Sequence, residues 1–137
     1  MKPCILYFSA SGNTKKFAQA ISTSLDLPIF NVEEVESQIV NDYDIIIIGT
    51  PVHGMLPAKV LSSFVKKISP INNKKAIIFS TYAIRKGSAN KNLEKQLDEK
   101  GFTTILDTSK RGIRFGEDAF EDNVVEIQKI LQSCSKT

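Results

Sequence analysis

The chain has 137 residues, 42% of them hydrophobic, which suffices for one domain with a real core and leaves no room for a second catalytic domain. We therefore expect a single domain over residues 1–137. The net charge is +3, but the Lys and Arg pairs are scattered and lack interleaved aromatic side chains, so nucleic-acid binding is not expected.

The chain shows no sign of secretion or membrane insertion. No apolar run approaches the length of a membrane span, and the first residues enter a strand-like run without the hydrophobic stretch of a signal peptide. Cys4 and Cys134 have neither a disulfide-framework spacing nor a C-x-x-C spacing. These features predict a cytoplasmic protein with reduced thiols and no membrane span.

Strand-like and helix-like segments alternate along the chain, which predicts an α/β fold with a parallel sheet. Residues 44–49 contain four consecutive isoleucines, so this segment is expected as a central strand buried on both faces. In chain order, the expected strands are residues 3–8, 28–32, 44–49, 75–81 and 102–107.

Apolar residues recur at helical spacing between these strands. Pro57 is expected as the first residue of a helix that ends before Pro70, and Gly101 is expected to terminate another helix in the left-handed conformation. The other expected helices are residues 12–25, a short acidic helix over residues 33–40, residues 88–100, and a closing helix that begins near Phe120.

The loop after the first strand is rich in hydroxyl groups. Ser9, Ser11 and Thr14 can each donate a hydrogen bond to a phosphate oxygen, and Gly12 allows a tight turn before the helix. Free backbone N–H groups at a helix start also favour an anion. A plain helix cap explains the same residues about equally well, with Ser11 as the N-cap and Thr14 at the third helical position.

Two later loops make the pattern specific. A Thr-Pro loop over residues 50–56 follows the central strand, and a Thr-Tyr loop over residues 81–87 follows the next one. Together with residues 9–14, these loops resemble the flavodoxin family over nearly the whole chain. The resemblance implies a flavodoxin-like three-layer doubly wound fold, with a five-stranded parallel sheet in the order 2-1-3-4-5 and the ligand at the switch point between the first and third strands.

The same resemblance implies FMN as the cofactor, with its phosphate in the first loop and its isoalloxazine ring between the other two. No catalytic or metal-ligating residue is expected. The implied cofactor-binding residues are Ser9, Ala10, Ser11, Gly12, Asn13, Thr14, Thr50, Pro51, Val52, His53, Gly54, Met55, Thr81, Tyr82, Ala83 and Gly87.

Individual roles in the second and third loops have alternatives. His53 and Met55 stand where family members usually place a bulky side chain against the flavin, although His53 facing solvent and Met55 plugging the next helix is the other interpretation. Gly54 is either the hinge that turns a carbonyl toward flavin N5 or a simple turn residue. Tyr82 either stacks on the ring or points into the core.

The sequence departs from the family pattern in its charge. Arg85 and Lys86 replace the acidic residues usual in the third loop, and Lys15 and Lys16 oppose the helix dipole unless an anion is bound nearby. FMN phosphate would relieve that conflict.

The resulting function hypothesis is an FMN-binding electron carrier that works with redox partner proteins, a reductase and an electron acceptor. The alternatives are an FMN-dependent reductase of a quinone or porphyrinogen-type substrate, and a flavin-free interaction module of the same fold. Other doubly wound proteins fit less well, because the central strand ends in Gly49-Thr50 rather than in a receiver domain's carboxylate and G-x-G-x-x-G is absent.

Overall fold

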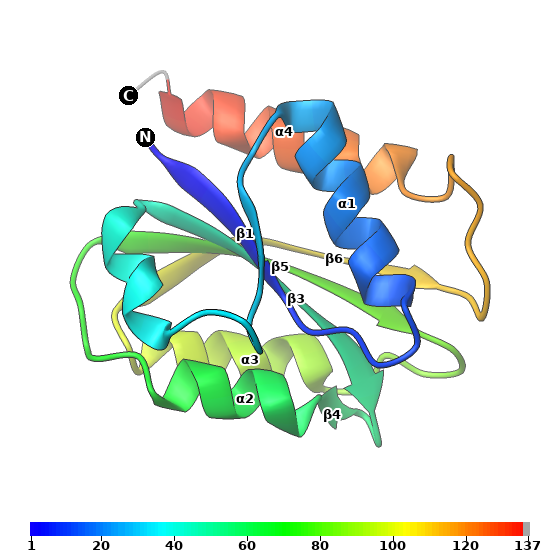
Figure 1. The fold of residues 1–137 in the computed structure, drawn as a ribbon, viewed down its shortest axis with the longest axis horizontal. Helices are drawn as coiled ribbons and strands as arrows, with labels where there is room; N and C mark the ends of the chain where they lie inside the picture. The colour runs from blue at the N-terminus through cyan, green and yellow to red at the C-terminus, as the bar shows by residue number, and fades with distance from the viewer. Residues whose placement is uncertain (136–137) are drawn as a thin grey trace.

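A computed structural model describes residues 1–135 and confirms the predicted alternation of strands and helices (Figure 1). The strands are β1 (Pro3–Tyr7), β2 (Ile29–Asn31), β3 (Ile45–His53), β4 (Leu56–Pro57), β5 (Lys74–Tyr82) and β6 (Phe102–Arg111). The helices are α1 (Asn13–Leu25), α2 (Lys59–Lys66), α3 (Ala89–Asp98), α4 (Glu121–Ser135) and the 3-10 helix η1 (Ser37–Asp42).

Five of the strands form a parallel sheet in the order β2-β1-β3-β5-β6. This is the predicted order 2-1-3-4-5, because β4 is a two-residue strand that pairs antiparallel with β3 alone. None of the helices within residues 1–135 is long and apolar enough to cross a bilayer.

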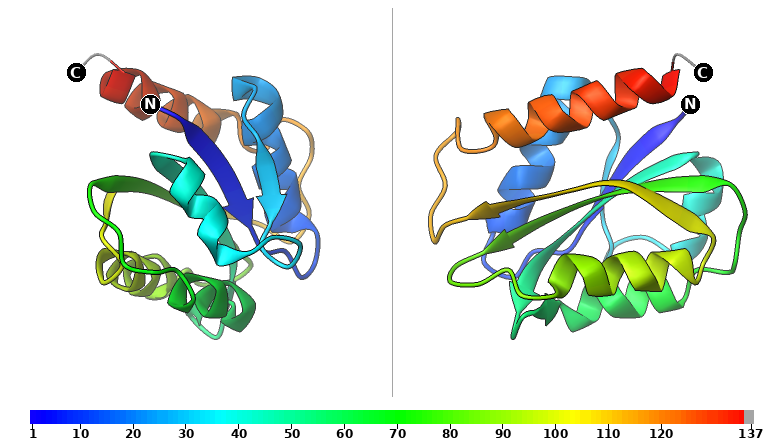
Figure 2. Two further views of the ribbon diagram at one scale, coloured as in Figure 1. Left: turned by 60° about the vertical axis from the view of Figure 1, so that its left-hand side comes forward. Right: turned by 180° about the vertical axis from the view of Figure 1, so that it is seen from behind.

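The sheet lies between two helical layers, with α1 and α4 on one face and α2 and α3 on the other (Figures 1 and 2). Successive side chains of β3 enter opposite cores, as the period of a strand requires. Ile46 and Ile48 pack in the cluster that contains Leu61 of α2, whereas Ile47 packs in the cluster that contains Phe17 of α1. The prediction of a central strand buried on both faces is confirmed.

The predicted helix over residues 33–40 is wrong. The amide oxygen of the Asn31 side chain accepts the N–H of Glu33 at 2.9 Å, which makes a local turn in place of the first helical turn. The backbone is still extended at Glu36, and only then does the 3-10 helix η1 begin. Because Val40 is the one buried residue of η1, too little apolar surface is present to favour a full α-helix.

The segment after the central strand is a β-hairpin rather than a loop that leads straight into a helix. β3 continues to His53, and the register pairs Val52 with Pro57 and His53 with Leu56. Pro57 is therefore a strand residue, not the predicted first residue of a helix, and α2 begins two residues later with Ala58 as its N-cap. The short edge strand tolerates a proline because it needs few ladder hydrogen bonds.

Candidate functional site

Four connections meet where the parallel strands end, at the right of Figure 1. Three are the predicted loops, after β1, β3 and β5, and the fourth follows β6. Ligand sites of open α/β sheets lie at this end, beside the strand at which the order reverses.

The first loop leaves the start of α1 without a side-chain cap. Gly12, not Ser11, is the N-cap, so the simple capping interpretation is wrong. Its φ of +97° is a conformation that favours glycine, and a Cβ atom there would point into open space. The first turn of α1 contains no acidic residue, and Lys15 and Lys16 follow within it. No carboxylate within the first turn of α1 therefore complements the positive end of this helix, although Glu117, from the connection after β6, lines a hollow together with Lys16.

Hydrogen bonds fix the first loop to its neighbours. The N–H of Gly12 donates to Ser9 Oγ at 3.0 Å. The buried Thr14 shares a hydroxyl–hydroxyl bond of 2.9 Å with Thr81 at the end of β5. Asn13 Nδ2 donates to the carbonyl of Ile113, in the connection after β6, at 2.9 Å. The start of α1 is thus held by two other segments of the site, which keeps its N–H groups oriented.

The hairpin is rigid at its base and turns tightly at its tip. Thr50, fully buried, donates its hydroxyl to the carbonyl of Pro51 at 2.8 Å and accepts the N–H of Ala58 at 3.0 Å. Gly54 and Met55 both have positive φ, +57° and +64°, as a type I′ turn requires. The left-handed backbone is costly at Met55, whose side chain is half-exposed.

The third loop packs directly under that tip. The carbonyl of Met55 accepts the N–H of Ser88 at 3.1 Å. A Cβ atom on Gly87 would lie 2.3 Å from the Cβ of Met55, so only glycine permits this approach. The structure thereby gives Gly87 a packing reason of its own, and its predicted role as a hydrogen-bond donor to the flavin stays a prediction.

A hollow of about 270 Å³ lies among these loops. It brings together residues from all three predicted loops and two that the sequence analysis missed, Gly112 and Ile113. Tyr82 is half-buried and lines this hollow, so it is not a core residue. The residues that line the hollow are Ser11, Asn13, Pro51, Val52, His53, Thr81, Tyr82, Ala83, Gly112 and Ile113.

The other predicted residues surround the hollow rather than line it. Thr14 and Thr50 use their hydroxyls within the protein, and Gly12, Gly54 and Gly87 shape the backbone. Ser9, Ala10 and Met55 are also outside the residues that line the hollow. The N–H of Gly112 donates to the carbonyl of Tyr82 at 2.9 Å, which joins the fourth connection to the third loop. The predicted sheet topology could have indicated that the connection after β6 contributes to the hollow, because the last parallel strand ends at the same edge of the sheet.

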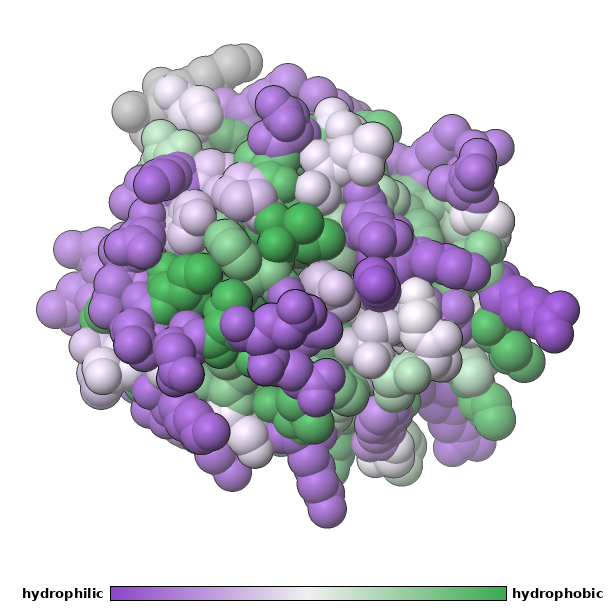
Figure 3. Space-filling model, in the orientation of Figure 1, coloured by the Kyte–Doolittle hydropathy of each residue, from purple (hydrophilic) through white to green (hydrophobic). Residues whose placement is uncertain are grey.

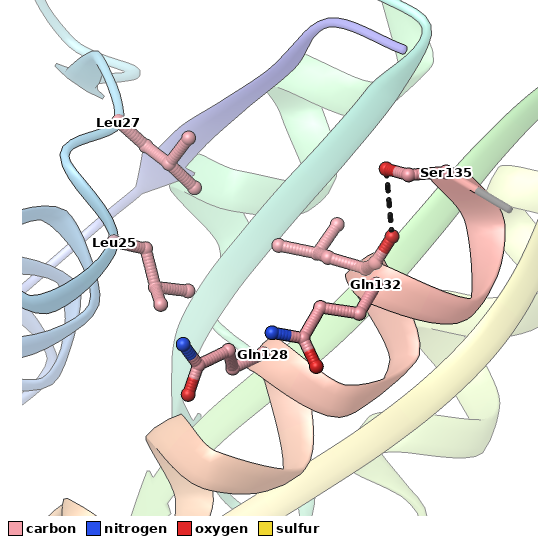
Figure 4. A pocket seen from close by; sticks show the side chains of 6 residues that line it. Leu25, Leu27, Gln128, Gln132 and Ser135 are labelled. Atoms are coloured by element: carbon pink, nitrogen blue, oxygen red, sulfur yellow. Dashed lines mark hydrogen bonds between the residues drawn. The ribbon is translucent and has the colours of Figure 1, made fainter.

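A larger hollow, of about 560 Å³, lies at the other end of α1 and α4 (Figure 4). Leu25 and Leu27 face Gln128 and Gln132 across it. The hydroxyl of Ser135 donates to the carbonyl of Leu131 at 3.2 Å, so it is already used within α4. None of its lining residues is charged and no helix begins there, so an anion has no reason to bind.

Neither metal ligation nor the thiol of Cys4 points to a second site in the described chain. No group of three His, Cys, Asp or Glu within residues 1–135 is placed to hold a metal ion. Cys4 is fully buried in the core, and burial raises the pKa of its thiol to about 12. A thiol that stays protonated in this way is a poor nucleophile.

The sheet order and the loop arrangement define the doubly wound α/β class, and the hollow lies at the switch point, where ligand sites of this class are found. A family model described as a flavodoxin domain matches residues 4–110. The chain therefore belongs to the flavodoxin family.

Individual comparisons identify a similar sequence and similar folds. An uncharacterized protein of Methanocaldococcus jannaschii is 38% identical over 108 residues, covering 77% of this chain and 71% of that protein. The structure of oxidised flavodoxin 1 from Bacillus cereus has a TM-score of 0.77 at 23% identity, covering 94% of this chain and 98% of that one. A flavoprotein from Lactobacillus acidophilus, solved in complex with FMN, has a TM-score of 0.66 at 21% identity and covers 90% and 98% of the two chains.

Proposed function

We propose that this chain binds FMN and carries electrons between a reductase and an electron acceptor in the cytoplasm, as one domain over residues 1–137. One observation carries the proposal: the start of α1 has no cap and no carboxylate, it has two lysines, and it adjoins the hollow formed by the second and third loops. A ligand with an anionic group attached to a flat ring would fit both features, because the anion complements the positive start of α1 and the ring fits the hollow. Membership in the flavodoxin family and the FMN complex of the similar Lactobacillus acidophilus flavoprotein support it.

The phosphate would lie against residues 9–14. Gly12 leaves open space where any other residue has a Cβ, and the first N–H groups of α1 point out of a turn without a side-chain cap. Ser11 is exposed and lines the hollow, so its hydroxyl is the best placed of the three to donate to a phosphate oxygen. Lys15 and Lys16 add positive charge to the same helical turn, although Lys16 lines a separate hollow that also contains Glu117.

The ring would lie in the hollow between the hairpin and the third loop. Tyr82, half-buried at the end of β5, and His53, exposed at the end of β3, both line this hollow and offer flat polarisable side chains, and Pro51 in the same lining restricts the backbone. Ala83 is the residue whose backbone N–H we assign to a flavin carbonyl. When bound, FMN supplies a ring that takes up one or two electrons, and the protein determines how easily it does so.

The hairpin tip would adjust to the charge on the ring. Rotation of the peptide between Gly54 and Met55 changes φ of Met55, which lies at +64° and leaves a costly region if it turns negative. The carbonyl of Met55 is held by Ser88, so this one peptide can rotate while the rest of the tip stays in place. We assign the hinge role to Gly54 on this basis.

The deciding experiment is an anaerobic titration of apoprotein with FMN, followed by stepwise reduction while the visible absorption spectrum is recorded. Tight binding with two separate one-electron steps supports the electron carrier. Binding with direct two-electron bleaching, together with turnover of a quinone or porphyrinogen, would instead favour a reductase. Absence of binding would leave the flavin-free interaction module.

A pair of matched variants places the phosphate. Gly12→Ala introduces a methyl group at the start of α1, where we expect binding to weaken at least about tenfold because the methyl group occupies the phosphate position. Gly116→Ala is the control for an added methyl group in open space outside the hollow, and the free energy of unfolding of the Gly12→Ala apoprotein controls for the strain of an alanine at φ +97°. Equal affinity in the two variants would contradict the assignment of residues 9–14 to the phosphate.

A further inference from the structure

Most of the exposed large hydrophobic residues of the described chain lie at one end of the molecule. Five of the seven lie in or beside the connections around the candidate site: Met55, Leu56, Val60, Ile84 and Ile113. Ile84 and Ile113 are 76% and 77% exposed, so neither side chain contributes to the core. Scattered exposed side chains need no explanation, but a cluster at one edge marks an interaction site.

Shared hollows connect Leu56, Val60 and Ile113, and Met55 and Ile84 belong to the adjoining loops. Leu56 and Val60 share a hollow with His53, and His53 also lines the hollow that contains Ile113. Met55 lies against Gly87 of the third loop, which also carries Ile84. On the right of Figure 3, where the strands end, hydrophobic and hydrophilic side chains project together.

The charges of this surface are strongly one-sided. We call residues 8–16, 50–60, 81–88 and 110–120 the basic edge. It contains eight Lys and Arg residues and two carboxylates, Glu117 and Asp118, so its net charge is +6. The whole chain carries +3, and the rest of the molecule therefore carries −3.

The distribution within this end of the molecule is also uneven. The connection after β2, at the margin of the sheet, carries Glu33, Glu34 and Glu36. The cations instead surround the ends of β3, β5 and β6, where the hydrophobic residues are. This end of the chain can therefore both attract and orient a partner surface of negative charge.

We propose that the basic edge is a docking surface for the acidic face of a protein electron-transfer partner. The proposal rests on the proposed function, because docking there places the partner over the loops that would hold the flavin. The exposed hydrophobic residues provide the close contact, and the surrounding cations accelerate encounter and set its orientation.

The test uses two redox proteins of opposite charge: a strongly acidic [2Fe–2S] ferredoxin and the cationic cytochrome c. Electron transfer between the FMN-loaded protein and each probe is followed by stopped flow from about 10 to 500 mM ionic strength. We expect the rate constant with the ferredoxin to fall at least about tenfold over this range, and the rate constant with cytochrome c to stay level or rise. The opposite pair of trends would overturn the proposal.

Variants distinguish a local surface from the overall charge. Lys59→Glu with Arg114→Glu reverses two exposed cations that flank the hydrophobic residues and lie outside the residues assigned to the flavin. Lys67→Glu with Lys129→Glu makes the same change in net charge on exposed positions of α2's C-terminus and of α4. We expect the first pair to slow the reaction with ferredoxin at least about fivefold at 10 mM ionic strength, and the second pair less than about twofold. Equal effects would show that no local surface exists.

A binding measurement separates failure of this proposal from failure of FMN binding. Gallium-substituted ferredoxin, which carries no electron, is added to the isotope-labelled protein with and without FMN, and shifts of the backbone amide resonances are mapped. Shifts confined to the basic edge support the docking surface even if FMN does not bind. Shifts spread over the whole molecule, or none at low salt, contradict it whether or not FMN binds. Ile84→Ser tests the hydrophobic contact. We expect this variant to bind ferredoxin more weakly than the wild type, and we expect the difference to remain at high salt.

Discussion

Helices α1 and α4 cover the same face of the sheet and begin at the same end of it (Figure 1). Their first turns are opposite in charge. α4 begins with Glu121 and Asp122. α1 has no acidic residue in its first turn and instead has Lys15 and Lys16. The two helices therefore treat the same dipole in opposite ways.

The difference indicates which helix start is complemented by the protein itself and which one is left to a bound anion. At α4 the protein's own carboxylates stabilise the positive end of the helix. At α1 the dipole and two cations repel each other, each contact of this kind being worth about 0.3–1 kcal/mol. Such an arrangement is tolerated where a bound anion makes the electrostatic energy at the helix start favourable. The hollow beside α1 provides room for such a ligand.

Charge reversal at α1 should give the largest effect, in two directions at once. In the variant Lys15→Glu with Lys16→Glu, we expect the dissociation constant for FMN to rise about tenfold to a hundredfold, because carboxylates replace the cations beside the phosphate. The free energy of unfolding of the apoprotein should increase by about 1 kcal/mol, because the helix dipole is then complemented. Fluorescence titration and urea denaturation measure the two. Unchanged affinity would make these lysines ordinary solvated residues.

The third loop tests whether the same reasoning holds at the ring. Reversing Arg85 and Lys86 to Glu should make the potential of the second electron more negative by about 50–100 mV, because an anionic ring loses two cationic neighbours at partial exposure. A spectroelectrochemical titration measures this potential. The reversal at Lys15 and Lys16 is the control, since it changes net charge equally at the phosphate end and should move the potential less. Equal shifts would show that overall charge, not location, sets the potential.

The matching reversal at α4 should have a smaller and simpler consequence. Replacing Glu121 and Asp122 by Lys should lower the free energy of unfolding by about 1 kcal/mol, since both changes oppose the dipole. FMN affinity should stay within about twofold, because neither residue lines the candidate site. Urea denaturation and FMN titration on the same sample check both statements. A loss of FMN affinity as large as that at α1 would remove the distinction between the two helices.

The elements that the sequence predicted well are those set by local pattern. Ile45 to Ile48 could hardly be anything except a central strand, and α1 ends where its apolar stripe ends. The sheet order came from the family resemblance rather than from periodicity. Its confirmation is what makes the first and second loops neighbours.

The errors share a cause, which is pairing between distant segments. β6 was expected to end at Asp107 but continues to Arg111, because each further residue pairs with β5 as far as Tyr82. This extension brings Gly112 and Ile113 to the candidate site, and no local pattern shows it. Pro57 was misassigned in the same way, since its pairing with Val52 is not visible in the residues around it.

The smallest effect expected is also the most direct test of the contrast between α1 and α4. Inorganic phosphate at about 10 mM should stabilise the wild-type apoprotein by about 0.5 kcal/mol, or roughly 2 °C in its unfolding midpoint, relative to chloride at the same ionic strength. The variant with Glu at positions 15 and 16 should lose this response. The variant with Lys at positions 121 and 122 is decisive, because it has cations at a helix start but no glycine with the backbone of Gly12. If it remains insensitive to phosphate, charge alone does not make the site, and the shape of the first loop is what distinguishes α1.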